Sequence, residues 1–131
     1  MIYYKFKDEI NPKEIALLRN SVGWNGMERY QVKSLNHSYF YICCYEDTKL
    51  IGFLDVVSNQ STDAYIQDVI VNPKYQGKGI GTKLMNMAID KLKEDNIYMI
   101  SVIFEETLML FYKKFGFNIM MAGQLETHYA E

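Results

Sequence analysis

One stretch of the chain constrains the fold more than any other. It runs from Val69 to Thr82 as an apolar segment, a proline turn and three alternating glycines that open a helical pattern. Glycine has no Cβ atom, so Gly77, Gly79 and Gly81 permit positive φ and a close approach of the backbone to a ligand. The helix begins within this loop, where unpaired first-turn amides and the positive end of the helix dipole favour an anion. The stretch therefore predicts a strand, a phosphate-binding loop and a helix.

The glycine spacing distinguishes this loop from two other phosphate-binding loops. A Walker loop places its lysine directly after the last glycine, whereas Lys78 precedes the second glycine here. The dinucleotide fingerprint requires Gly-x-Gly-x-x-Gly, with an acidic residue about 20 residues later. The glycines at 77, 79 and 81 do not have that spacing. The loop therefore excludes a P-loop nucleotide hydrolase and does not match a dinucleotide site.

The motif Gln76-Gly-Lys-Gly-Ile-Gly81 resembles the Gln/Arg-x-x-Gly-x-Gly/Ala signature of the GNAT superfamily of acyl-CoA-dependent N-acyltransferases. Two flanking motifs support the resemblance: Asn72-Pro73 after an apolar strand, and Phe111-Tyr-Lys-Lys-Phe-Gly-Phe117 about thirty residues after the loop. The family has the same order of strand, loop, helix, strand, helix and aromatic-glycine-phenylalanine ending. The resemblance covers residues 39–121. Residues 1–38, which usually shape substrate choice in the family, match only in general layout.

Length and composition predict one soluble domain. A chain of 131 residues is long enough to bury a core but short for two domains, so we expect residues 1–131 to form a single N-acetyltransferase domain. The chain has no apolar run long enough to span a bilayer and no secretory signal pattern at its start, which predicts no membrane insertion and a cytoplasmic location. A net charge of −2 argues against nucleic-acid binding.

The two cysteines, Cys43 and Cys44, are neighbours in an apolar run that predicts a strand. Their side chains should point to opposite faces of the sheet, a geometry that a disulfide between them would strain. Adjacent cysteines without histidine partners do not form a zinc site. We therefore expect buried structural thiols and no metal.

Hydrophobic periodicity predicts a chain of alternating strands and helices. The helix between the strand over 64–71 and the strand over 97–104 should make these two strands parallel in a right-handed βαβ unit. The resulting fold class is α/β (α+β), with a mixed, mostly antiparallel central sheet and flanking helices. The resemblance further implies that the parallel pair splays apart. Further strands are expected over 2–6, 39–46, 50–58, 117–121 and 125–129, and helices over 13–22, 27–34, 80–92 and 107–115.

The resemblance implies how the chain would bind acetyl-CoA as co-substrate. In the family, the pantetheine arm lies between the splayed strands like an additional strand. The backbone of Val69, Ile70 and Val71 would then pair with its amides, which is strand addition at an edge. The same three side chains also fit an ordinary core strand. The loop would hold the pyrophosphate through Gln76, Gly77, Lys78, Gly79, Ile80, Gly81 and Thr82.

The resemblance also implies a general acid. Tyr112 corresponds to the tyrosine that protonates the coenzyme thiolate in many family members, and a phenol keeps its proton at neutral pH. A tyrosine that only packs against the coenzyme is the alternative. The general base is less defined, because the positions where relatives carry Glu or His are Tyr65 and Gln67. Asp68 is the candidate base, although strand alternation places it on the face opposite Gln67, where a structural role competes. A water chain touching Gln67 or Tyr65 is the other route.

The expected reaction is direct transfer of an acetyl group to a primary amine of a small molecule, in a ternary complex. Two alternatives stay open: acetylation of a protein lysine or N-terminus, and a non-catalytic acyl-CoA-binding module, which the missing base suggests. In relatives, the region around Trp24 forms a wall of the acceptor pocket. Homodimers are common in the family, and an exposed edge strand near the C-terminus offers a contact surface.

Overall fold

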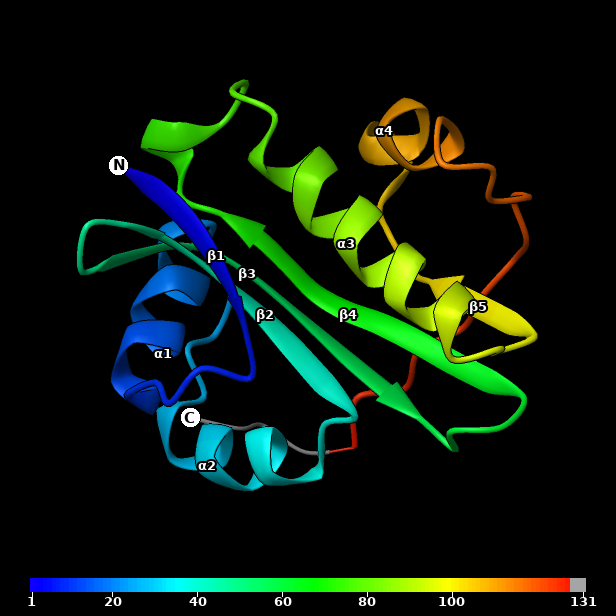
Figure 1. Ribbon diagram of the computed structural model, residues 1–131, viewed down its shortest axis with the longest axis horizontal. Coiled ribbons are helices and arrows are strands. Elements are labelled where there is room, and N and C mark those ends of the chain that lie inside the picture. Colours follow the sequence, from blue (N-terminus) through cyan, green and yellow to red (C-terminus); the bar gives the residue numbers. More distant parts are fainter. Residues whose placement is uncertain (128–131) are drawn as a thin grey trace.

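The structure, a computed structural model, describes residues 1–127 (Figure 1). Its elements follow the order expected from the sequence, with strands before the glycine loop and a helix directly after it. The strands are β1 (Ile2–Phe6), β2 (Phe40–Glu46), β3 (Lys49–Ser58), β4 (Asp63–Val71) and β5 (Met99–Val102). The α-helices are α1 (Pro12–Ser21), α2 (Glu28–His37), α3 (Ile80–Glu94) and α4 (Met109–Lys113), and two 3-10 turns are η1 (Pro73–Tyr75) and η2 (Glu106–Leu108).

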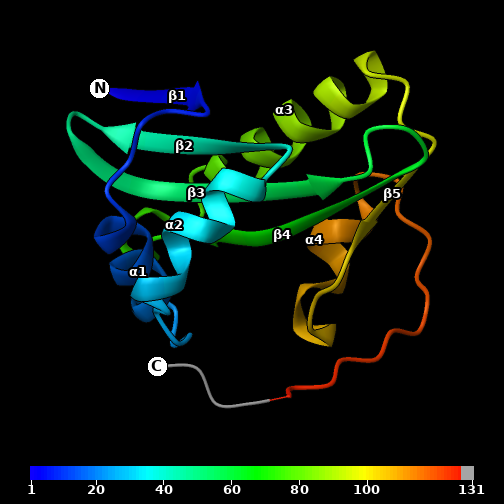
Figure 2. The ribbon, with the colours of Figure 1, turned by 90° about the horizontal axis from the view of Figure 1, so that it is seen from below.

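The five strands form one sheet in sequence order, which confirms the predicted mixed architecture. Strands β1 to β4 pair antiparallel, and β4 pairs with β5 in parallel. Helix α3 provides the crossover and covers one face of the sheet, while α1 and α2 cover the other face (Figures 1 and 2). Among the described residues, no helix has the length and apolar character needed to cross a membrane.

Two hydrophobic clusters hold these layers together, one on each face. Helix α3 contributes fully buried residues to the first cluster, including Leu84, Met85 and Ala88, because its apolar residues recur at helical spacing. Helix α1 contributes Ile15 and Leu18 to the second cluster. The strands serve both clusters through alternation, which the two cysteines illustrate. Cys43 belongs to the α1 cluster and Cys44 to the α3 cluster, both with free, buried thiols, as the sequence predicted.

Strand β4 is interrupted by a bulge that changes its direction. Phe53 of β3 pairs with Ile70 and Asp55 pairs with Gln67, so one residue of β3 faces two residues of β4. Asp68 occupies the extra position with a φ of 53°. A bulge of this kind bends a strand and increases its twist. It also breaks the alternation on which the expected placement of Asp68, opposite Gln67, depended.

The pairing of β4 with β5 stops where this bulge begins. The parallel register runs from Asp63↔Met99 to Ile66↔Val102, and β4 then continues to Val71 without β5. Figure 1 shows the two chains diverging beyond this point, β4 toward η1 and the segment after β5 toward α4. The predicted splayed pair is therefore present.

The end of the chain differs from the sequence prediction. A strand was expected over 117–121, but the structure has no strand or helix from residue 117 to residue 127. The second expected strand, over 125–129, is likewise absent from 125–127, and residues 128–129 lie outside the described residues. Strand propensity requires a partner edge to become a strand, and this segment runs apart from the sheet (Figure 2).

Candidate active site

The glycine loop has the backbone geometry expected of an anion cradle. Gly77 and Gly79 adopt φ values of 78° and 83°, in the left-handed region that favours glycine. A Cβ atom at either position would meet nothing within 4 Å, so the space beside the loop is open. Gly79 is the N-cap of α3, and its carbonyl accepts the first hydrogen bond of the helix, from the amide of Lys83 at 3.0 Å. The earlier first-turn amides therefore have no partner within the helix and are available to a ligand.

Side chains fix this loop to the rest of the site. The Gln76 Nε2 donates to the Val71 carbonyl oxygen at 3.0 Å, which ties the loop to the end of β4. The Thr82 Oγ1 accepts from the Lys114 Nζ at 2.8 Å, which ties the first turn of α3 to the residue after α4. A Cβ atom at Gly81 would lie only 3.3 Å from the Phe111 Cζ, so glycine permits the close contact of α3 with α4.

The remaining two loop residues have different surroundings. Ile80 is buried in the α3 cluster, so only its backbone amide can face a ligand. Lys78 is exposed, with its Nζ 5.4 Å from the centre of the Tyr75 ring, and it adds positive charge at the mouth of the loop.

The end of β4 has an unpaired backbone edge on the side of β5, and its side chains pack on the two faces of the sheet. Ile70 is 1% exposed and belongs to the α1 cluster, whereas Val69 and Val71 pack against the α3 cluster. Ile70 and Val71 pair with β3, and none of the three residues pairs with β5. The structure thus brings the free edge of β4 and the glycine loop together at one end of the strand.

Tyr112 lies on α4, across the divergence from β4. Its side chain is 5% exposed and stacks on Phe104, with ring centroids 4.5 Å apart, while Phe111 makes an edge contact at 4.9 Å. Burial raises the pKa of Tyr112 to about 12, and nearby Tyr65 adds to this effect. At neutral pH the phenol is therefore protonated, which suits a proton donor.

Asp68 is held in an ion pair that connects the bulge to α1. The Arg19 Nη1 lies 2.6 Å from the Asp68 Oδ2, and the two side chains are 14% and 27% exposed. The same guanidinium lies 5.4 Å from the Trp24 ring and donates from Nε to the Asn25 carbonyl at 2.7 Å. One arginine therefore fixes the loop between α1 and α2 over the bulge of β4.

A buried carboxylic acid, which was not predicted from the sequence, lies on the α1 and α2 face. Asp55 of β3 is only 2% exposed. Its Oδ1 accepts from the Ser38 hydroxyl, and its Oδ2 accepts from the Gln67 Nε2 at 2.8 Å. Gln67, expected to touch a water chain, is therefore bound to an acid. The sequence feature that could have indicated this buried acid is a single acidic residue within the apolar run of residues 50–57. Buried acids are rare without partners, so hydrogen-bond partners would also have been expected.

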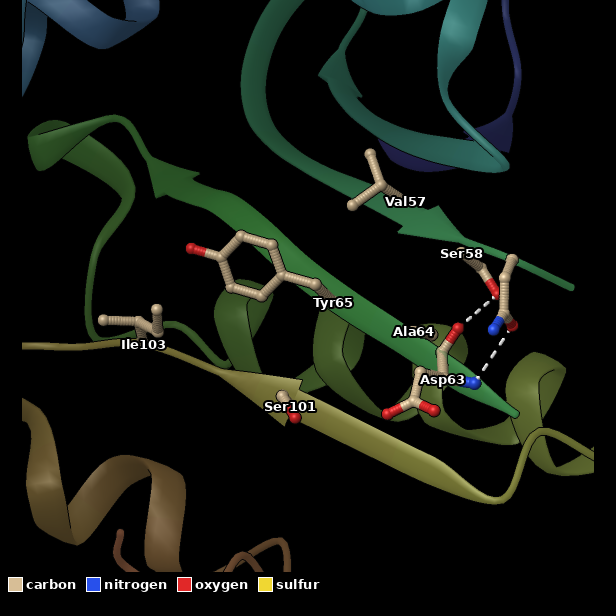
Figure 3. A pocket seen from close by; sticks show the side chains of 8 residues that line it. Val57, Ser58, Asp63, Ala64, Tyr65, Ser101 and Ile103 are labelled. Carbon is tan, nitrogen blue, oxygen red and sulfur yellow. Dashed lines mark hydrogen bonds between the residues drawn. The ribbon is translucent and has the colours of Figure 1, made fainter. Parts of the chain in front are cut away.

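Next to Tyr65, the sheet carries a shallow concavity of about 590 Å³. Figure 3 shows its floor on β4 and its sides on β3 and on the chain at β5, with the Tyr65 ring projecting from β4. The residues that line this concavity are Val57, Ser58, Asn59, Asp63, Ala64, Tyr65, Ser101 and Ile103.

Within residues 1–127, no group of three or more His, Cys, Asp or Glu side chains is arranged to hold a metal ion.

The buried acid predicts a specific pH dependence of stability. Burial raises the pKa of Asp55 above its ordinary value, and the hydrogen bonds from Ser38 and Gln67 only partly oppose this. The folded state then binds the proton more tightly than the unfolded state, so stability falls as pH rises from the ordinary to the raised pKa. Asp55→Asn removes this loss, and a turned Gln67 amide can still bond to the new side chain. We expect its unfolding free energy, measured in urea, to rise relative to wild type as the pH is increased above the ordinary Asp pKa of about 4.

The exposed Asp90→Asn exchange on α3 controls for the loss of one negative charge. A constant free-energy difference between Asp55→Asn and wild type across this pH range would show that the Asp55 carboxyl is not perturbed in the folded protein.

Comparisons with known proteins give the same assignment as the motifs. Residues 7–117 match the Acetyltransferase (GNAT) family. An uncharacterized N-acetyltransferase, ycf52, from Porphyra purpurea is 33% identical over 121 residues, covering 88% of this chain and 70% of that protein. Histone acetyltransferase TAP1 from Glycine max is 35% identical over 73 residues, which are 56% of this chain and 32% of that protein.

A solved structure supports the fold over nearly all of the chain. The crystal structure of a protein of unknown function from meticillin-resistant Staphylococcus aureus aligns with a TM-score of 0.87 at 24% identity, covering 98% of this chain and 100% of that one. The family match spans the glycine loop, the splayed strands and Tyr112. The chain therefore belongs to the GNAT family of acetyltransferases.

Proposed function

We propose that this protein transfers the acetyl group of acetyl-CoA directly to a primary amine of a small molecule. One observation carries the proposal: the glycine loop, the unpaired end of β4 and Tyr112 meet where β4 and β5 diverge. An anion cradle, an edge for an extended ligand and a buried acid are the three parts that thioester transfer from coenzyme A requires.

The coenzyme would lie along the end of β4 and onto the start of α3. The amides of residues 77–82 would bind its pyrophosphate, helped by the helix dipole. The exposed edge of Val69, Ile70 and Val71 would pair with the pantetheine amides. The residues present fit this ligand, because the loop is open beside both positive-φ glycines. The Gln76 bond to Val71 would keep the two binding segments in register.

The proposed acetyl transfer requires one proton donor and one proton acceptor. The amine nitrogen forms a bond with the thioester carbonyl carbon, the carbon–sulfur bond breaks, and the Tyr112 hydroxyl gives its proton to the sulfur. The amine loses a proton to the Asp68 Oδ1, directly or through water, since Arg19 engages the Oδ2. Tyr112 recovers a proton from solvent. We therefore keep Tyr112 as general acid and Asp68 as candidate base.

A protein amine is the second candidate acceptor. The 73-residue match to histone acetyltransferase TAP1 favours a protein amine. Residues 1–38, which include the loop over the bulge, are the part of the chain most expected to set the acceptor. A panel of amino acids, polyamines, aminosugars and lysine peptides, assayed for release of free coenzyme A thiol, decides between them. A non-catalytic binding module would bind acetyl-CoA and release thiol with no member of the panel.

Tyr112→Phe tests the general acid. The variant keeps the ring that stacks on Phe104 and loses only the hydroxyl. We expect kcat for thiol release to fall roughly hundredfold or more, while the Kd for acetyl-CoA, measured by calorimetry, changes by less than about twofold. Tyr98→Phe, at an 82% exposed tyrosine, is the matched control and should retain full activity. Unchanged kcat in Tyr112→Phe would remove the acid role and leave the binding proposal standing.

Gly79→Ala tests the anion cradle. Alanine at a φ of 83° is strained, by about 1–2 kcal/mol, so relaxation should move the loop amides. We expect coenzyme A to bind roughly tenfold more weakly by calorimetry. Gly23→Ala is the matched control, because Gly23 has a φ of 84°, also has open space beside it, and lies in the loop between α1 and α2. Equal loss of coenzyme affinity in both variants would place the pyrophosphate elsewhere.

A further inference from the structure

The buried Asp55 controls the orientation of a neighbouring amide. Both of its carboxylate oxygens accept a hydrogen bond, Oδ1 from the Ser38 hydroxyl and Oδ2 from the Gln67 Nε2 at 2.8 Å. An ionised carboxylate can only accept hydrogen bonds, so it turns the nitrogen of the Gln67 amide toward itself. The oxygen of the same planar amide, Oε1, must then point away from Asp55.

This amide oxygen is available to a ligand. The Gln67 side chain is only partly buried, and no group within residues 1–127 donates a hydrogen bond to its Oε1. An amide oxygen carries two lone pairs, both of which can accept. Gln67 therefore presents a hydrogen-bond acceptor that a buried acid holds in one orientation.

Strand register places this acceptor beside the concavity. Val57 pairs with Tyr65, and this pair lines the concavity (Figure 3). Asp55 pairs with Gln67 as the next pair along the same face, and successive pairs on one face lie roughly 7 Å apart. This second pair lies one step nearer to the divergence of β4 and β5, because the parallel register ends at Ile66.

The bulge brings a second acceptor to the same face. Asp68 follows Gln67 directly, and regular alternation would place it on the α3 face. Its ion pair with Arg19 of α1 shows that the carboxylate lies on the α1 and α2 face instead. One amide oxygen and one carboxylate oxygen therefore face the same side of the sheet. A neutral primary amine has two N–H bonds to offer while its lone pair attacks a carbonyl carbon.

We propose that Asp55 is a positioning residue, which holds the Gln67 Oε1 so that it accepts one N–H of the acceptor amine while Asp68 accepts the other. This inference rests on the proposed function and adds a binding role to it. An amide oxygen does not remove a proton at neutral pH, so Gln67 would orient the amine and leave the proton to Asp68. Loss of this hydrogen bond should weaken amine binding and leave coenzyme binding unchanged.

Two single variants and their combination separate the acid from the amide that it holds. Gln67→Met keeps the length of the side chain and removes the oxygen. Asp55→Leu keeps a similar volume and releases the Gln67 amide. The Ser38 hydroxyl can still donate in this variant, because the Ser34 carbonyl oxygen lies 3.1 Å away. Asp90→Leu, at an exposed position of α3, controls for the loss of an aspartate.

Thiol release is measured with putrescine, glucosamine and a lysine peptide, each varied at saturating acetyl-CoA. For the amine that wild type uses best, we expect either single variant to raise KM about three- to tenfold. The kcat and the KM for acetyl-CoA should stay within about twofold of wild type. The Asp55→Leu/Gln67→Met variant should match Gln67→Met alone, because Asp55 acts through Gln67. Asp90→Leu should leave every constant unchanged.

An exchange of the two functional groups should rescue amine binding. In Asp55→Asn/Gln67→Glu, the carboxylate at position 67 can only accept, so the amide at position 55 must donate to it. One carboxylate oxygen then remains for the amine, and the KM for the amine should not exceed the wild-type value.

The results distinguish this inference from the proposed function. An unchanged KM for the amine in Gln67→Met, or effects that add in the double variant, would overturn the role of the pair while wild-type turnover stands. A wild type that releases no thiol with any of the three amines would overturn the proposed function, and this inference with it.

Nuclear magnetic resonance tests the positioning step without activity and without any variant. The side-chain amide hydrogen that Gln67 donates to Asp55 should exchange with water measurably more slowly than the side-chain amide hydrogens of the exposed Gln60. Equal exchange rates at the two glutamines would show that Asp55 does not hold the amide, and would overturn the proposal.

Discussion

The site depends on one interruption in the hydrogen-bonded ladder of the sheet. Strand β4 keeps β5 as a neighbour only to Ile66, and the bulge at Asp68 then turns the rest of β4 away. Without this interruption, β5 would occupy the edge that we assign to the coenzyme, and α4 could not stand apart from β4 with Tyr112 between them. A bulge costs ladder hydrogen bonds, so its position is stabilised by other contacts.

Those contacts come from the face that carries α1 and α2. Arg19 binds the Asp68 carboxylate, and Asp55 holds Gln67 on the other side of the bulge. The opposite face is apolar and packs α3 tightly, which fixes where the glycine loop begins. The two faces therefore have different tasks: the α3 face sets the position of the loop, and the polar face sets the shape of β4.

Local features of the site were predictable from the sequence because they depend on local chemistry. The glycine loop follows from the requirement for positive φ at Gly77 and Gly79, and α3 follows from its apolar spacing. The bulge was not predictable, because alternation assumes a regular strand and placed Asp68 opposite Gln67. Asp55 was missed because its partners, Ser38 and Gln67, come from distant parts of the chain. The strand expected over 117–121 is absent for a related reason, since its pattern is typical of a strand but the segment does not pair with the sheet.

The central claim is that the free end of β4 and the glycine loop form one coenzyme-binding surface. Backbone amide chemical shifts, followed by nuclear magnetic resonance as coenzyme A is added, test it most directly. We predict that the largest changes fall together on residues 69–71 and 77–82, with the amides of α1 nearly unchanged. Saturable changes confined to the concavity around Val57 and Asp63, with the loop and the end of β4 unaffected, would contradict it.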